Sequence, residues 1–213
     1  MRRCTCFTRL NRSFTHRMAR LEALLLPVVG NHNSEADRIV SFVVVNAMSA
    51  WAGFVREYYL SCALLRPKTI LGQRVSHSQS SIKDERLALI HSISVLKGKT
   101  LTAPRITPRD EPAWHEKRAL SALSASLSLS NNGSVVSALS YQTTFFDEMP
   151  TIRNFFAHRS QGTAEKVERL AKKYKVPAAR PTELINSLLS GATQTIAQEW
   201  LGDMKQVSNV LCQ

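Results

Sequence analysis

Residues 34–65 read SEADRIVSFVVVNAMSAWAGFVREYYLSCALL, a long and very apolar stretch that indicates how the chain folds. The β-branched run at 43–45 alone would suit a strand, but the pattern around it is too long for one. We therefore predict one long helix, with Ser34 as its N-cap and an acid three positions on, ended by Pro67. Side chains at spacings of three and four carry this helical pattern: Ile39, Phe42, Val43, Asn46, Ala47, Ala50, Phe54 and Tyr58.

The flanking sequence predicts more helices and little else. Pro112 suits the first turn of one of these helices, and residues 131–133 end it. Pro150 interrupts the helical pattern again further on. The fold class is therefore all-α, with one long apolar helix near the N-terminus and additional helices in a C-terminal extension from about residue 176. The predicted helices are 10–26, 34–65, 83–97, 113–129, 134–148, 151–159, 163–175 and most of 182–211, with a loop at 67–81 and an irregular linker at 98–112.

Composition supports one domain, placed at residues 18–213. The chain has 213 residues of which 44% are hydrophobic, enough for a sizeable core, and only 8 Gly and 8 Pro, which favours helices over a turn-rich β fold. The net charge of +12 would attract a polyanion such as RNA, or an anionic membrane surface. No uninterrupted apolar run reaches the ~18 residues of a membrane span, so we expect no membrane partner.

The N-terminal segment 1–17 is the exception to this domain. Residues 1–21 hold six arginines and no acid, a composition similar to that of a transit peptide. The alternatives are a flexible basic segment, an untranslated stretch before Met18, or the start of a basic first helix. The four cysteines form no C-x-x-C pair, so we expect reduced thiols, no metal site and a cytoplasmic location.

Residues 152–159 carry the side chains most suited to chemistry. With Thr151 as a cap, they form a short helix in which Arg153 lies in the first turn, close to free backbone N–H groups that favour a phosphate. The apolar members of this helix, which we expect to face the core together, are Ile152, Phe155 and Phe156.

Two further polar residues complete the candidate site. Asn154 and His158 are four apart and share one helix face. Arg153 and His158 are five apart and point about 140° from each other, so a second copy of the chain would bring the missing group more naturally. An imidazole can move the proton of a 2′-hydroxyl or of a leaving oxygen, and a guanidinium can stabilise a dianionic phosphorane.

A second arginine–histidine pair has the same spacing, at Arg86 and His91. The residues between them are all apolar, and no polar residue follows the arginine. We interpret that pair as part of an ordinary amphipathic helix.

The segment Arg153-Asn154-Phe155-Phe156-Ala157-His158 resembles the R-x4-H motif of HEPN domains, in the form with a polar residue after the arginine. The resemblance implies a homodimeric helical bundle whose two motifs face each other. It implies a toxin or abortive-infection endoribonuclease that needs no metal or cofactor and leaves 2′,3′-cyclic phosphate and 5′-hydroxyl ends. Arg153 and His158 would be catalytic and Asn154 supportive, with an antitoxin or regulatory protein as a further partner. Ser160 stands where some of these toxins have a tyrosine that an antitoxin modifies.

Two other functions stay open at this point. One is a HEPN-like module that binds or regulates without catalysis, and the other is an unrelated basic helical protein that binds nucleic acid. The basic helix at 163–175 is either a solvated surface or a track for the RNA backbone. Its cations are Lys166, Arg169, Lys172, Lys173 and Lys175.

Overall fold

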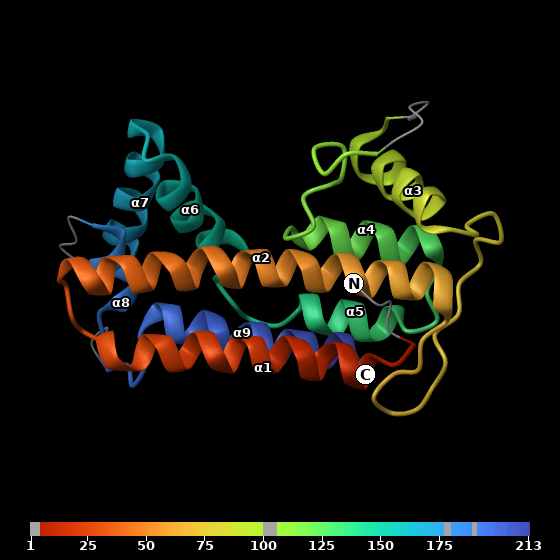
Figure 1. Cartoon of the computed structure of the whole chain (residues 1–213), viewed down its shortest axis with the longest axis horizontal. Coiled ribbons are helices and arrows are strands. Elements are labelled where there is room, and N and C mark those ends of the chain that lie inside the picture. Colours follow the sequence, from red (N-terminus) through yellow and green to blue (C-terminus); the bar gives the residue numbers. More distant parts are fainter. Residues whose placement is uncertain (1–4, 100–105, 177–179, 189–190) are drawn as a thin grey trace. The chain divides into compact units, whose positions relative to one another are not determined.

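The computed structural model describes residues 5–99, 106–176, 180–188 and 191–213. Within these ranges the chain forms nine α-helices and no β-strand, which confirms the all-α prediction (Figure 1). The helices are α1 Phe7–Leu25, α2 Ser34–Leu65, α3 Glu85–Lys97, α4 Lys117–Leu127, α5 Asn132–Leu139, α6 Phe145–His158, α7 Gln161–Lys173, α8 Pro181–Asn186 and α9 Ile196–Leu211. A short 3-10 turn, Leu26–Val28, follows α1.

The long apolar helix α2 spans the predicted residues, but its cap differs from the prediction. Asn33 caps it, because its side-chain oxygen accepts from the backbone N–H groups of Glu35 at 3.1 Å and Ala36 at 2.8 Å. Ser34 is the first residue inside the helix. Asparagine caps at least as well as serine, so the two neighbours compete for one position and the asparagine takes it.

By length and composition, α2 could cross a membrane. The sequence expectation considered uninterrupted apolar runs, whereas α2 contains an 18-residue window with a mean hydropathy of at least 1.2 in spite of its charged residues. Half of that window is buried inside the protein. A core helix passes the same test, so this property alone does not place α2 in a membrane.

The chain divides into two compact units. Unit 1 comprises residues 1–14, 51–141 and 207–213, and unit 2 comprises residues 15–50 and 142–206. The helices α1, α2 and α9 each contribute residues to both units. All three predicted site residues lie in unit 2.

Aromatic packing forms the core of unit 1. Phe7 stacks on Tyr58 with ring centroids 4.7 Å apart, and Phe14 lies 4.8 Å from Phe54. These contacts join the start of α1 to the second half of α2 (Figure 1). Tyr58, Tyr59 and Trp51 are buried, so they belong to this core and are not accessible to stack on a base.

The middle of the chain departs most from the predicted helix boundaries. The predicted helix 113–129 begins only at Lys117, and Pro112 lies outside it. The break predicted at 131–133 is present but lies slightly earlier: α4 ends at Leu127, Ser128 has a positive φ of 52°, and α5 begins at Asn132 and contains Gly133. The predicted helix 134–148 is therefore two helices, α5 and α6, separated at 140–144. Part of the predicted linker 98–112, residues 100–105, lies outside the described residues.

Candidate functional site

The site residues lie on α6, which is longer than predicted. The helix begins at Phe145 and includes Pro150, so Thr151 is not a cap and no interruption occurs there. Four side chains at helical spacing bury the inner face of α6: Phe145, Phe146, Met149 and Ile152. Their burial contributes about 1.5–3 kcal/mol each, which together exceeds the ~3 kcal/mol that a proline inside a helix costs.

This longer helix changes the surroundings of Arg153. The arginine lies about two turns beyond the helix start, so the expected phosphate cradle between Arg153 and a helix N-terminus is wrong. A helix N-terminus follows His158 instead. Ser160 caps α7, and its side chain accepts from the N–H of Thr163 at 3.3 Å.

The start of α7 keeps free donors. The N–H groups of Thr163 and Ala164 both donate to the carbonyl of Ser160. Those of Gln161 and Gly162 have no acceptor in the part of the chain that the structure describes. Free N–H groups at a helix start favour an anion, and here they follow His158 by three and four residues.

The three predicted residues are accessible to solvent, but not all of them meet. Asn154 and His158 are exposed and Arg153 is half-buried. The Arg153 guanidinium donates to the Asn154 side-chain oxygen at 3.1 Å. His158 is the last residue of α6, about 7.5 Å further along the axis and turned about 140° from Arg153. One chain therefore brings Arg153 and Asn154 together and leaves His158 apart from the arginine.

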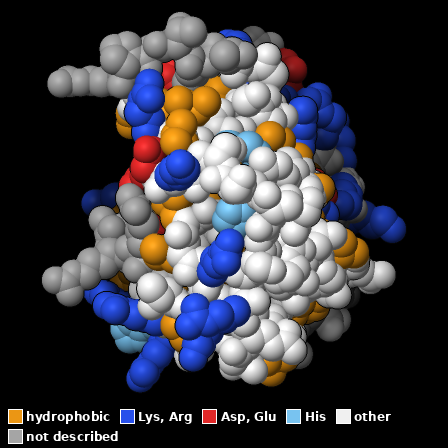
Figure 2. All heavy atoms as spheres, turned by 90° about the vertical axis from the view of Figure 1, so that its right-hand side faces the viewer, with side chains coloured by type: hydrophobic (Ala, Val, Ile, Leu, Met, Phe, Trp, Pro, Cys, Tyr) orange, Lys and Arg blue, Asp and Glu red, His pale blue; other side chains and the backbone are white. Residues whose placement is uncertain are grey.

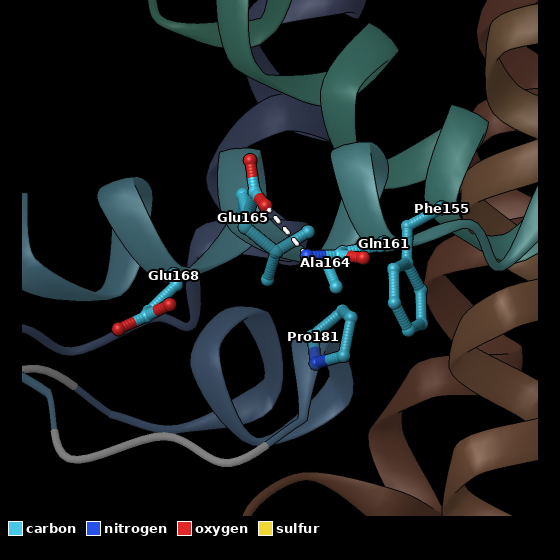
Figure 3. A pocket seen from close by; sticks show the side chains of 7 residues that line it. Phe155, Gln161, Ala164, Glu165, Glu168 and Pro181 are labelled. Atoms are coloured by element: carbon cyan, nitrogen blue, oxygen red, sulfur yellow. Dashed lines mark hydrogen bonds between the residues drawn. The ribbon is translucent and has the colours of Figure 1, made fainter.

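The aromatic residues of the motif are only partly in the core. Ile152 is fully buried, as expected, whereas Phe155 and Phe156 are half-buried. Phe155 lines a hollow of about 540 Å³ formed by α6, α7 and the start of α8 (Figure 3). The sequence did not point to this hollow, because its other walls come from residues 161–168 and Pro181.

A buried carboxylate connects α6 to the end of α7. Glu148 on α6 is 4% exposed and accepts from Lys173 Nζ at 2.5 Å and from Tyr174 Oη at 2.6 Å. Burial and the hydrogen bond to Glu148 raise the pKa of Tyr174 to about 12. These contacts hold the helix that carries the candidate site against α7.

The basic residues of α7 are not equivalent. Lys173 binds Glu148, and Lys172 pairs with Glu168 at 3.1 Å. Lys166 and Arg169 are exposed and have no ion-pair partner among the described residues. Positive charge is not confined to this helix: the face seen in Figure 2 shows many more Lys and Arg side chains than Asp and Glu.

The second arginine–histidine pair lies on α3 and has a structural role. His91 is half-buried, and its ring nitrogens face Tyr59 Oη at 2.9 Å and Ser126 Oγ at 3.4 Å. Tyr59 donates its own proton to the carbonyl of Ala88 at 2.8 Å, so His91 Nδ1 must donate to the tyrosine. The structure therefore supports the interpretation of this pair as part of an ordinary helix.

No family model, curated protein or solved structure matches this chain. Among the described residues, no group of three or more His, Cys, Asp or Glu side chains lies close enough to hold a metal ion. What the fold and the site define is a class: a basic all-α protein with an arginine, an asparagine and a histidine accessible on one helix.

Proposed function

We propose that the chain is a metal-independent endoribonuclease of the HEPN type, with Arg153 and His158 as catalytic residues and Asn154 in support. The observation that carries the proposal is the position of His158, exposed at the end of α6 and directly before the free N–H groups of α7. A phosphate bound at that helix start would lie beside the imidazole. The net charge of +12 supports an anionic polymer as substrate.

The chemistry of the proposal is a transesterification within RNA. The 2′-oxygen loses its proton as it attacks phosphorus, and the leaving 5′-oxygen gains one; the imidazole of His158 carries out one of these two proton transfers and water the other. The bond between phosphorus and the 5′-oxygen breaks, which leaves a 2′,3′-cyclic phosphate and a 5′-hydroxyl. Arg153 stabilises the dianionic phosphorane, and Asn154 holds the guanidinium through the observed hydrogen bond.

The proposal includes a second copy of the chain. Arg153 and His158 point about 140° apart on one helix, so the two groups serve one phosphate most directly when they come from different copies. A two-fold homodimer with facing α6 helices would build two such composite sites.

The proposed setting is that of a toxin or abortive-infection effector in the cytoplasm, held inactive by an antitoxin or another regulatory protein. Ser160 is the N-cap of α7. It lies where some toxins of this type have a modified tyrosine, so the proposed inhibitor acts elsewhere on the chain.

The direct test is cleavage of labelled RNA by the full chain in excess chelator. We expect cyclic-phosphate ends, and rates at least about 100-fold lower for Arg153→Ala and His158→Ala. Arg118→Ala and His32→Ala are matched controls, since both side chains are exposed in other helices or loops. Full activity in either site variant would contradict the proposal. Binding of RNA without cleavage would indicate a nucleic-acid-binding protein instead.

Mixing the two inactive variants tests the composite site. If each site takes Arg153 from one copy and His158 from the other, half of the dimers are mixed and half of their sites are intact. The mixture should then recover about a quarter of the wild-type rate. No recovery, in a mixture shown to exchange subunits, would place both groups on one chain.

A further inference from the structure

The hollow between α6, α7 and α8 has no part in the chemistry described above. Phe155 from α6 and Pro181 from α8 line it (Figure 3), together with Val167 from α7. Its volume of about 540 Å³ lies in the range of sites that bind small molecules and nucleotides. We propose that this hollow holds the base 5′ to the cleaved bond and selects guanine, an inference that rests on the proposed nuclease function.

Phe155, which lines the hollow, lies nearer to His158 than to Arg153 around the axis of α6. Phe155 and His158 are three residues apart on α6, so they are neighbours on the helix surface, about 60° apart around its axis. Phe155 and Arg153 point about 160° apart. A nucleotide whose phosphate lies at the start of α7 can therefore place its base against Phe155.

The walls of the hollow suit a flat aromatic ring. In Figure 3 the Phe155 ring and Pro181 face the hollow from one side, and Ala164 points into it from α7. Phe155 is half-buried, which fixes its ring while leaving part of it accessible. Any base can stack on an aromatic side chain, so these walls would contribute affinity but no selectivity between bases.

The rim of the hollow presents mainly hydrogen-bond acceptors, and these would determine which base is selected. The Gln161 side-chain amide donates one of its two N–H groups to Glu165 Oε1 at 3.2 Å. Glu168 Oε1 accepts from Lys172 at 3.1 Å. What remains is the second carboxylate oxygen of each glutamate, together with the Gln161 amide oxygen and one amide N–H, so acceptors outnumber donors at the rim.

Among the four bases, guanine matches such a rim best. Its Watson–Crick edge carries two adjacent donors, the N1–H and the 2-amino group, which a carboxylate can accept together. Adenine and cytosine place an acceptor beside their donor, and uracil places its donor between two acceptors, so each would bring an acceptor against a carboxylate. The same carboxylates repel a phosphate, which leaves the phosphate at the start of α7.

The test measures binding apart from cleavage. The full chain is titrated with guanosine, adenosine, cytidine and uridine 3′-monophosphates by calorimetry. We expect guanosine 3′-monophosphate to bind at least about tenfold more tightly than the others. Glu165→Gln should remove that preference, and the control Glu116→Gln, an exposed carboxylate directly before α4, should keep it.

Equal binding of the four nucleotides, or an unchanged preference in Glu165→Gln, would overturn the inference. So would tighter binding of a polyamine such as spermidine than of guanosine 3′-monophosphate, which would indicate a site for cations. Cleavage sites mapped on RNA of mixed sequence separate the two proposals. Cleavage without preference for guanine refutes the base site alone, whereas guanine binding without any cleavage refutes the nuclease alone.

Discussion

The contact between Glu148 and the end of α7 should stabilise the part of the fold that carries the candidate site. Two substitutions separate its two halves. Tyr174→Phe removes the hydroxyl that donates to Glu148 at 2.6 Å, and Lys173→Met removes the ammonium at 2.5 Å while keeping most of the side chain.

The surroundings of the two donors predict different losses in the free energy of unfolding for the two substitutions. The Tyr174 hydroxyl donates to a carboxylate that is only 4% exposed, and such a bond to a charged group contributes about 1.5–3 kcal/mol. The Lys173 side chain is 60% exposed, so water screens its ion pair, which we expect to contribute about 1 kcal/mol or less. The tyrosine, although neutral, should therefore be the more important partner.

Urea unfolding followed by circular dichroism measures both costs. At low salt Tyr174→Phe should lose more free energy of unfolding than Lys173→Met. At 1 M salt the Debye length is about 3 Å, so the exposed ion pair is screened and the cost of Lys173→Met should shrink. The cost of Tyr174→Phe should stay the same. A larger cost for the lysine variant that also persists in salt would refute this account of the contact.

Three further predictions concern the cap of α2, the proline inside α6 and the half-buried histidine of α3. Asn33→Ala should lower the free energy of unfolding by about 0.5–2 kcal/mol, and Ser34→Ala by less, since only the asparagine caps α2. Pro150→Ala should raise it by up to about 2 kcal/mol by restoring a helix N–H; a destabilised variant would contradict this. Burial, followed by the charge of His77, lowers the pKa of His91, so the unfolded chain takes up this proton first as the pH falls. Stability should thus decline below about pH 6.5, and the decline in urea midpoint from pH 7.5 to 5.5 should be smaller in His91→Gln; an equal decline would exclude this residue as the source.

The long helices could be predicted from the sequence, because each repeats its apolar residues over several turns. This is why α2 and the first helix begin and end within a few residues of their predicted limits. The short helices could not. The run 131–133 is a strong local signal, yet the break lies at 128–131, and Pro150 is a second strong signal that the burial of neighbouring side chains on α6 overrides.

The candidate site was predictable only in part, for a related reason. The residues Arg153, Asn154 and His158 and their exposure on a late helix follow from local sequence. Their surroundings do not, since the cradle expected beside Arg153 depended on a helix start that the burial of Phe146 and Met149 moves to Phe145. The hollow beside Phe155 depends on Pro181, which is distant in sequence and near only in the fold.

The two arginine–histidine pairs of this chain show what spacing alone leaves undecided. Arg86 with His91 and Arg153 with His158 have the same separation on a helix, hence the same angle of about 140°. Both ring nitrogens of His91 face hydroxyl groups inside unit 1, and a base already engaged in that way cannot take a proton from a substrate without breaking those contacts. His158 faces solvent and is followed within three residues by a new helix. The next helix start, rather than the distance to the arginine, is therefore the feature that separates a candidate catalytic histidine from a structural one in this protein.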